Sequence, residues 1–399
     1  MSEWKEYKLS NAPLQIIDGD RGKNYPSQDE YSSVGDCLFL STKNVRFKGF
    51  DFSECQFISK ERDELLRKGK IERNDLVLTT RGTVGNIGFY SDKVKYNNIR
   101  INSGMVIIRP DKNKLVPSFN YYIFRHLQKD FLTFTTGSAQ PQLPIRDLNE
   151  IEIILPPLPE QERIAEILSN LDDKIDLLHR NNKTLDQLAE TIFRQLFIED
   201  QKDDCKKSTL GELIKVIDNR GKTPNFSETF TNYPVIEVNA LNGPNRYINY
   251  TLIKKYVDEN TYNNWFRAGH PKVNDILFST VGSIGEMSMM LNTHGTIAQN
   301  IVALRAEKIS PYYLYQYLLY IQDEIKEYDI GSVQPSIKVT HLIKIEIPLP
   351  DTNKVILFDK QANNICNKIS ANYNQIIQLE ILRDTLLPKL MSGIVRVEN

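Results

Sequence analysis

Hydroxyl and basic side chains gather in two glycine-containing turns of the sequence. The first is Thr79-Thr80-Arg81-Gly82-Thr83, and the second is Ser279-Thr280-Val281-Gly282-Ser283. Such a turn lets backbone N–H groups and short hydroxyls approach phosphate oxygens closely. Arg81 could neutralise a phosphate or donate two hydrogen bonds to a guanine edge. An ordinary hairpin whose glycines have positive φ explains the glycines about as well, but it explains the repeated hydroxyls less well.

Two Arg-Gly-Lys tripeptides place pairs of cations beside a flexible residue. They are Arg21-Gly22-Lys23 and Arg220-Gly221-Lys222, and each is as compatible with phosphate contact as with a solvated loop. Amide side chains in proline-marked loops form another class of candidates, because an amide can read adenine through two hydrogen bonds. These loops, which could equally serve packing between a domain and a helix, contain Gln140, Gln142, Gln334 and Ser336.

The sequence lacks the motifs of enzymes that act on DNA or nucleotides. It has no GxxxxGK[ST] phosphate loop, no Asn-Pro-Pro-aromatic motif for amino methylation, no HExxH and no Gly-x-Ser-x-Gly. The cysteines have no CxxC or CxH spacing, which favours reduced structural thiols over a zinc site or disulfides; they are Cys37, Cys55, Cys205 and Cys366. We therefore expect a binding protein with neither catalytic nor metal-ligating residues.

Size and composition set the broad class of the protein. The 399 residues are too many for one ordinary core, so two or more domains are expected. The net charge of -1 argues by itself against a strongly basic nucleic-acid binder. No apolar run reaches about eighteen residues, and the N-terminus lacks the pattern of a signal peptide. We expect a cytoplasmic protein.

The sequence contains an internal repeat. Residues 74–85, NDLVLTTRGTVG, return as residues 274–285, NDILFSTVGSIG, with the apolar, hydroxyl and glycine positions but one kept in kind. The GSAQP at 137–141 returns as GSVQP at 331–335, and Ile-Glu-Ile precedes a Leu-Pro stop in both halves. A repeated unit of about 195 residues is too long for a solenoid and indicates two copies of one domain type.

One basic cluster lies where the two copies differ. Lys43, Arg46 and Lys48 are close together in the first copy, whereas the corresponding segment of the second contains Asn239 and Arg246. Different residues on a common frame are what two readers of different DNA sequences need. These side chains complete our candidates for DNA contact.

Long stretches without glycine or proline run from 160 to about 198 and from about 353 to 387. Their apolar residues recur at alternating spacings of four and three, which is the pattern of a coiled-coil seam. A helix of roughly 39 residues would be about 58 Å long and could not bury such a stripe without a partner helix. The first seam comprises Ile164, Leu168, Leu171, Ile175, Leu178, Asn182, Leu185, Ala189, Ile192 and Leu196. The second comprises Phe358, Ala362, Ile365, Ile369, Asn372, Ile376, Leu379, Arg383, Leu386 and Leu390.

Polar residues interrupt both seams. If the helices pair antiparallel and centre near Arg180, one layer joins Asn182 to Asn372, and another joins Leu178 to Ile376. A buried Asn pair would fix the register of the helices. The alternative, equally open from the sequence, is that each Asn faces solvent.

Tyrosines cluster after a proline in the second copy, at Pro311-Tyr312-Tyr313-Leu314-Tyr315-Gln316-Tyr317, and the first copy has a related segment after Pro117. A platform for base stacking is one interpretation. Helical spacing after a proline at the first helical position favours an amphipathic core helix instead.

These elements together predict an α+β fold with an internal pseudo-two-fold repeat. Short apolar strands and glycine-rich turns open each copy, and a proline-bounded strand closes it. We expect two similar mixed α/β domains, residues 1–158 and 201–350, separated by two long antiparallel coiled-coil helices. The first helix occupies 159–200, and the second, with a tail, occupies 351–399.

The chain resembles the specificity subunits of type I restriction-modification enzymes over essentially its whole length. The resemblance rests on the paired blocks at 74–85 and 274–285, the GSxQP blocks, the LPPLPEQERI that opens the first helix at 155–164, and the LLPKLMSG tail at 386–393. Pro-Leu-Pro-x-Gln-x-x-Ile is highly typical of this family. The second copy departs from it, since PLPDTNKV at 348–355 lacks the Gln and Glu.

The resemblance implies that domains 1–158 and 201–350 are target-recognition domains. Each would read one half of a split, asymmetric target in double-stranded DNA, and the helices would set the gap and bind two methyltransferase subunits. Motor-nuclease subunits would complete the restriction enzyme. S-adenosylmethionine, ATP and Mg²⁺ would be bound by these partners and not by this chain. Partner subunits could also supply much of the phosphate contact, which would make the near-neutral charge tolerable.

Two other classes of function stay open on the sequence. A nuclease or methyltransferase fused to such readers is opposed by the missing motifs; cleavage or methyl transfer by the chain alone would support it. A stand-alone DNA-binding coiled-coil scaffold or regulator would bind its site tightly without partner enzymes. Specific binding that does not change when a methyltransferase is added would favour this scaffold.

Overall fold

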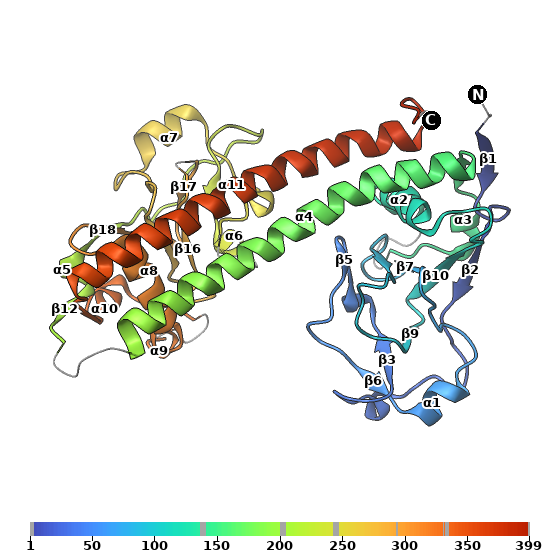
Figure 1. Ribbon diagram of the computed structural model, residues 1–399, viewed down its shortest axis with the longest axis horizontal. Coiled ribbons are helices and arrows are strands. Elements are labelled where there is room, and N and C mark those ends of the chain that lie inside the picture. The colour runs from blue at the N-terminus through green and yellow to red at the C-terminus, as the bar shows by residue number, and fades with distance from the viewer. Residues whose placement is uncertain are drawn as a thin grey trace. The chain divides into compact units, whose positions relative to one another are not determined.

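The computed structural model describes residues 4–135, 141–199, 205–241, 247–292, 294–329, 331 and 335–397 (Figure 1). Contacts divide the chain into unit 1, Met1–Ile175 with Gln378–Asn399, and unit 2, Asp176–Ile377. Both long helices cross this division. Helix α4 (Leu158–Phe193) begins in unit 1 and ends in unit 2, whereas α11 (Thr352–Met391) begins in unit 2 and ends in unit 1.

A four-stranded antiparallel sheet in the order β2-β10-β7-β8 forms the centre of unit 1. Its strands are β2 (Leu14–Asp18), β7 (Leu76–Thr79), β8 (Ile87–Phe89) and β10 (Met105–Pro110). Because successive side chains of a strand point to opposite faces, the sheet contributes to two cores. Leu76 and Leu78 pack with α2 (Pro117–Leu127) and the first turns of α4, whereas Val77 packs with the second layer of the unit. Both faces are therefore covered, which explains why β7 and β10 are almost entirely apolar.

The second layer of unit 1 is a three-stranded sheet in the order β6-β3-β9. It consists of β3 (Cys37–Leu40), β6 (Phe57–Ile58) and β9 (Ile99–Ile101), with β3 and β9 parallel. A short helix, α1 (Lys60–Leu65), follows β6. A small hairpin of β4 (Val45–Arg46) and β5 (Gly49–Phe50) lies beside β7 and β8.

Unit 2 repeats this plan. Its sheet has the order β13-β18-β15-β16, formed by β13 (Ile214–Ile217), β15 (Ile276–Ser279), β16 (Met287–Met289) and β18 (Ile301–Ala306). Helix α8 (Pro311–Tyr320) takes the place of α2. On the other face, β14 (Val235–Ile236) pairs in parallel with β17 (Thr296–Ile297). The remaining helices are α5 (Leu210–Leu213), α6 (Val238–Leu241), α7 (Glu259–Trp265), α9 (Gln322–Lys326) and α10 (Val339–Leu342).

A two-stranded antiparallel sheet closes each unit where its long helix begins. In unit 1, β1 (Lys5–Lys8) pairs with β11 (Glu152–Leu155), which follows α3 (Ile145–Asn149). In unit 2, β12 (Lys207–Thr209) pairs with β19 (Glu346–Pro348). The predicted order of strands, closing strand and long helix is therefore confirmed in both copies.

The repeated Asn-Asp pair of the sequence builds the frame of each unit. Asn74 and Asn274 have φ of 79° and 70°, in the left-handed region that Asn tolerates better than most residues. The following Asp is almost fully buried and accepts two hydrogen bonds from one arginine. Asp75 binds Arg109 at 2.9 and 2.7 Å, and Asp275 binds Arg305 at 3.0 and 2.7 Å. This ion pair joins the turn before β7 or β15 to the neighbouring strand of the same sheet, β10 or β18.

The two long helices run antiparallel within each unit. In unit 2, Asn372 Nδ2 donates to Asn182 Oδ1 at 2.7 Å, and the two side chains are 2% and 0% exposed. The predicted Asn layer is thus confirmed, and the solvent-facing alternative is wrong. Leu178 and Ile376 are also buried. The remaining predicted seam residues are buried or half-buried: Ile164, Leu168, Leu171, Ile175, Leu185, Ala189, Ile192, Leu196, Phe358, Ala362, Ile365, Ile369, Leu379, Arg383, Leu386 and Leu390.

In unit 1 the seam is interrupted by Arg383, which forms an ion pair. Its Nη1 donates to Asp172 Oδ1 at 2.8 Å, and the hydroxyl of Tyr122 on α2 donates to Asp172 Oδ2 at 2.8 Å. Burial raises the pKa of the Tyr122 hydroxyl, and the Asp172 charge raises it further. Burial would lower the pKa of Arg383, but its hydrogen bond to Asp172 raises it instead. Tyr122 therefore remains a neutral donor and Arg383 a cation.

The ends of the helices differ from the prediction. Helix α4 begins at Leu158 and changes after Phe193 into a wider π-type turn, Arg194–Glu199. Helix α11 continues through Pro388 to Met391, beyond the proline-free stretch that ends near 387. A proline inside a helix costs about 3 kcal/mol. Here Leu390 and Met391 are buried in the core of unit 1, and this burial offsets the missing helical hydrogen bond.

The tyrosine-rich segment is a core helix, as predicted. Tyr313 and Tyr315 of α8 are 2% and 6% exposed, and Phe119 of α2 is fully buried. The four cysteines are free thiols. No helix among the described residues is both long enough and apolar enough to cross a membrane. The same residues contain no cluster of three His, Cys, Asp or Glu side chains arranged for a metal.

Candidate nucleic-acid interface

Segments that carry candidate residues meet around the loop 102–104 of unit 1. Arg21 Nη2 donates to Ser103 O at 3.4 Å, and the backbone N–H of Arg81 donates to Gly104 O at 3.2 Å. Thr42 packs so closely that its Cγ2 would lie 2.9 Å from a Cβ added at Gly104. Segments far apart in the sequence thus present their side chains on one part of the unit.

The exposed members of this group are Arg21, Lys43, Arg81 and Thr83. Gln142 is half-buried, and its backbone forms an isolated β-bridge with Arg81. Within the described part of the chain, neither Lys43 nor Arg81 forms an ion pair. Two such cations and a neighbouring amide can contact both phosphates and base edges.

The prediction that the first two hydroxyls of each turn contact phosphates is wrong. Thr79 and Ser279 are fully buried, and their hydroxyls donate to Thr83 O and Ser283 O within the turn. Thr80 Oγ1 donates to Gly104 O at 3.1 Å, and Thr280 Oγ1 donates to Asn300 O at 3.2 Å. These hydroxyls satisfy internal carbonyls and are not available to a phosphate. Thr83 and Ser283, at the tips of the turns, are exposed.

Several predicted arginines are paired within their own units. Arg220 donates to both oxygens of Asp218, at 2.9 and 2.7 Å. Arg220 was predicted as a phosphate contact, but its guanidinium is already bound within unit 2. Arg21 lies 3.1 Å from Asp18, and Arg46 lies 3.4 Å from Asp51; both remain exposed. Lys23 and Lys222 are exposed and form no ion pair among the described residues.

The counterpart of the turn in unit 2 has a different surface. Val281 stands where unit 1 has Arg81, and it forms the isolated β-bridge with the half-buried Ser336. Asn239 is exposed, and its Nδ2 donates to Leu252 O at 3.4 Å. Gln140, Arg246 and Gln334 lie outside the described residues.

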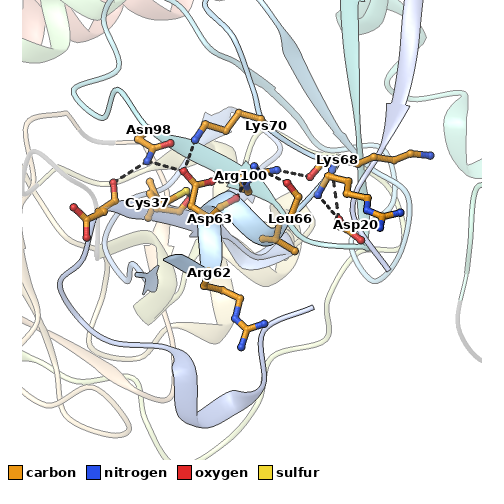
Figure 2. Close-up of polar contacts among 12 residues, drawn as sticks. Asp20, Cys37, Arg62, Asp63, Leu66, Lys68, Lys70, Asn98 and Arg100 are labelled. Carbon is orange, nitrogen blue, oxygen red and sulfur yellow. Dashed lines mark hydrogen bonds and ion pairs between the residues drawn. The ribbon is translucent and has the colours of Figure 1, made fainter. Parts of the chain in front are cut away.

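Two cations that join this surface were not among the candidates predicted from the sequence. Arg67 and Lys68 are exposed, and they line the same surface as Arg21 and Lys23. The carboxylate of Asp20 holds this segment by accepting hydrogen bonds from the backbone N–H groups of Arg67 and Lys68; Figure 2 shows Asp20 beside Lys68. Asp20 is far from Arg67 and Lys68 in the sequence, so the sequence alone did not bring these segments together. The only signal available was that Arg67 and Gly69 recur as Arg267 and Gly269.

A buried ionic cluster holds this segment in place. Arg100 of β9 is 7% exposed; it forms an ion pair with Asp63 and donates to the carbonyl of Leu66 at 3.0 Å (Figure 2). Burial alone would raise the pKa of Asp63, but hydrogen bonds from Lys70, Arg100 and Asn98 lower it to about 2. Asp63 is therefore ionised at neutral pH, and Arg100 holds the loop that follows α1 through the carbonyls of Leu66 and Lys68.

The family-typical residues at the start of α4 serve internal contacts. Glu160 accepts from Arg396 Nε and Nη2 at 2.7 and 2.8 Å and from Trp4 Nε1 at 3.1 Å. The hydrogen bond from Arg396 is the main cause of the lowered pKa of Glu160. Gln161 accepts from the N–H of Val116 at 2.9 Å and is buried. These contacts fix α4 to the other elements of unit 1.

The second copy, which lacks this Glu and Gln, fixes its helix differently. Lys354 Nζ donates to Leu196 O at 2.9 Å, and Ser310 donates to Asp359. The departure from the sequence pattern is thus compensated by other internal contacts of unit 2.

The sequence of this chain matches a protein-family model, that of the type I restriction modification DNA specificity domain. The match covers residues 1–187 and again residues 202–381. The chain belongs to this family. The two matches fall on the two copies of the repeat, so the repeat represents two specificity domains with a long helix after each.

Curated relatives and a solved structure agree with this membership. The type I restriction enzyme MjaIX specificity subunit of Methanocaldococcus jannaschii is 26% identical over 82% of this chain and 79% of its own length. The HindI specificity subunit of Haemophilus influenzae is 21% identical over 98% of this chain and 100% of its own length. The crystal structure of the type I restriction-modification S subunit from M. genitalium covers 98% of this chain and 96% of its own, with 18% identity and a TM-score of 0.58. At this identity the structure supports the fold alone.

Proposed function

We propose that this chain is the DNA-specificity subunit of a type I restriction-modification complex. The globular part of unit 1 reads one half of a bipartite, asymmetric duplex target, and that of unit 2 reads the other half. The observation that carries this proposal is the pairing of a common frame with different exposed side chains. The buried Asp75–Arg109 and Asp275–Arg305 pairs are equivalent, whereas Arg81 is replaced by Val281.

The long helices supply the gap between the half-sites and the docking surfaces for two methyltransferase subunits. Their seam residues are buried between the helices, but other apolar residues of the same helices are exposed. Leu188 is 47% exposed on α4, and Ile356 and Ile381 are 64% and 62% exposed on α11. Ile356 and Ile381 each have an exposed leucine beside them, Leu357 and Leu382, and adjoining exposed apolar side chains support docking of a partner.

In this proposal the chain contributes specificity and no catalysis. Methyl transfer from S-adenosylmethionine belongs to the methyltransferase subunits, and ATP- and Mg²⁺-dependent restriction belongs to motor-nuclease subunits. The chain's own residues bind and position the duplex, so that each half-site is presented to a bound partner.

Co-expression tests the proposal directly. The chain would be produced with the methyltransferase subunit encoded beside it, and host DNA would be analysed by modified-base sequencing. We expect methylation at one split, asymmetric motif that disappears when this chain is omitted. Methylation without the chain, or none although the two subunits bind each other, would contradict the proposal. The second outcome would favour a DNA-binding scaffold.

A further inference from the structure

A basic pocket opens on unit 1 beside the candidate interface. It has a volume of about 380 Å³ and is lined by Asp18, Asp20, Arg21, Lys23, Arg67 and Lys68. The ion pair with Asp18 balances the charge of Arg21. Among the described residues, Lys23, Arg67 and Lys68 form no ion pair. The pocket therefore carries more positive than negative side chains and suits an anion.

The pocket is built by contacts to the backbone. Asp20 Oδ2 accepts from the N–H of Arg67 at 2.7 Å and from that of Lys68 at 3.4 Å, and Oδ1 accepts from the N–H of Gly22 at 2.9 Å. From the other side, Arg100 Nη1 donates to Lys68 O at 2.7 Å. Burial would raise the pKa of Asp20, but these backbone hydrogen bonds lower it. The carboxylate thus joins two basic segments while their cationic side chains extend into solvent.

Unit 2 contains a related construction, in which the side chain of the equivalent residue holds the equivalent segment through partly different hydrogen bonds. Asn219 Oδ1 accepts from the N–H of Ala268 at 3.0 Å, and its Nδ2 donates to Gly269 O at 2.9 Å. The segment that it holds begins with Arg267, which is exposed, and the neighbouring loop carries the exposed Lys222. Gly69 and Gly269 have φ of 83° and 82°, so the two held segments also turn alike. The arrangement recurs although the residue that makes it has changed from Asp to Asn.

We propose that each unit carries a phosphate clasp, formed by Lys23 with Arg67 in unit 1 and by Lys222 with Arg267 in unit 2, that binds backbone phosphates of duplex DNA without reading its sequence. This inference rests on the proposed function. A repeated pair of exposed cations on a rigid backbone is suited to phosphates, which are the same at every step of a duplex. The surface around Lys43, Arg81 and Gln142 differs between the units and is suited to base edges. Phosphate binding and base recognition are thus assigned to separate residues.

The clasp is tested by the salt dependence of DNA binding. The full chain, purified with its methyltransferase subunits, would be titrated onto a duplex of random sequence at several chloride concentrations. We expect the Lys23→Ala/Arg67→Ala variant to reduce the slope of log K against log salt by about 0.9 for each phosphate that is no longer neutralised. The Lys222→Ala/Arg267→Ala variant should do the same. The matched control is Lys5→Ala/Lys112→Ala, which removes two other exposed cations of unit 1 and should leave the slope unchanged.

Three results would overturn the clasp. One is a slope equal to that of the control, and another is a changed methylation motif in the clasp variants. The third is that the clasp variants lose the competition between inorganic phosphate and the duplex but keep the wild-type slope of log K against log salt. This result would assign the pocket to a small anion. Absence of any split motif for the wild-type complex would instead contradict the proposed function, so the two failures are distinguishable.

Asp20 acts as a positioning residue, and its substitutions test the construction. Because Asn219 holds the equivalent segment of unit 2, Asp20→Asn should keep the wild-type salt slope. Asp20→Ala should reduce it, since the N–H groups of Arg67 and Lys68 lose their acceptor. A reduced slope in both variants, or in neither, would contradict the assigned role. Thermal unfolding of each variant would check that unit 1 remains folded.

Discussion

At the scale of single residues, the buried amide pair of Asn182 and Asn372 favours register over stability. Burying an amide costs free energy unless its donors and acceptors are satisfied. Asn372 donates to Asn182, but the Nδ2 of Asn182 has no partner among the described residues. The layer is therefore less stabilising than a pair of leucines would be. Any shift of one helix along the other would separate the amides and leave both without a partner.

Substitution of this pair separates its two effects. Asn182→Leu alone leaves Asn372 buried without its partner, and we expect a loss of about 1–3 kcal/mol in the free energy of unfolding. The double variant Asn182→Leu/Asn372→Leu should recover this loss or exceed wild type. Urea unfolding of Asn182→Leu, Asn372→Leu and the double variant measures these free energies. The control is Leu178→Ile, a conservative change in the neighbouring layer of the same seam. Equal, additive losses in the two single Asn variants and their double would show that the residues do not interact.

Other single residues mark the limit of prediction from the sequence. The positions of the repeat could be recognised, but their roles were set by contacts that the sequence does not display. Thr79 and Thr83 belong to the same repeated turn, yet the hydroxyl of Thr79 satisfies a carbonyl inside it and Thr83 is exposed. Asp20 meets Arg67 across a long separation, with Asn219 in its place in the other copy. Such partners emerge only when the fold brings the segments together.

At the scale of elements, the helices and central strands were predictable because their patterns are periodic. The Asn182–Asn372 layer followed from extending both seams with one spacing rule. The ends of the helices were predicted less well. Helix α11 continues through Pro388, because the burial of Leu390 and Met391 offsets the cost of a proline inside the helix. Small elements such as α1 and α7 were not predicted, because they are too short for periodicity to reveal.

The helices provide a prediction about the length of the gap in the target. In the antiparallel pair, Arg180 lies opposite Asn374, because Asn182 pairs with Asn372. A four-residue helical insertion after each of these positions would lengthen both helices by about 6 Å. We expect the gap to grow by about one or two base pairs, with both half-sites unchanged, as measured by modified-base sequencing. Replacement of four residues at the same places, without insertion, is the control. An unchanged gap would mean that the helices do not set the spacing.

At the scale of the whole molecule, each unit contains its own sheets, its own core and one end of both helices. The closing sheet of unit 1 pairs β1 with β11, and Trp4 and Arg396 both contact Glu160 at the start of α4. These contacts involve β1, β11, the start of α4 and the C-terminal segment. In the sequence they are separate from the strands and loops that carry the candidate DNA residues. The strands and loops that carry most of the candidate DNA residues can therefore be exchanged while these contacts of Glu160 are kept.

An exchange designed on these contacts tests whether the two units read independently. Residues 14–110 would be replaced by the equivalent segment of another family member, which keeps β1, α2, β11 and the contacts of Glu160, Gln161 and Asp172. We expect one half of the methylated motif to change while the other half and the gap stay the same, because the frame of unit 2 has its own core. The reciprocal exchange of residues 214–306, which keeps α8, should change only the other half. If either exchange altered both halves, the units would not recognise DNA separately, and the division of the target between two copies of one domain would be wrong.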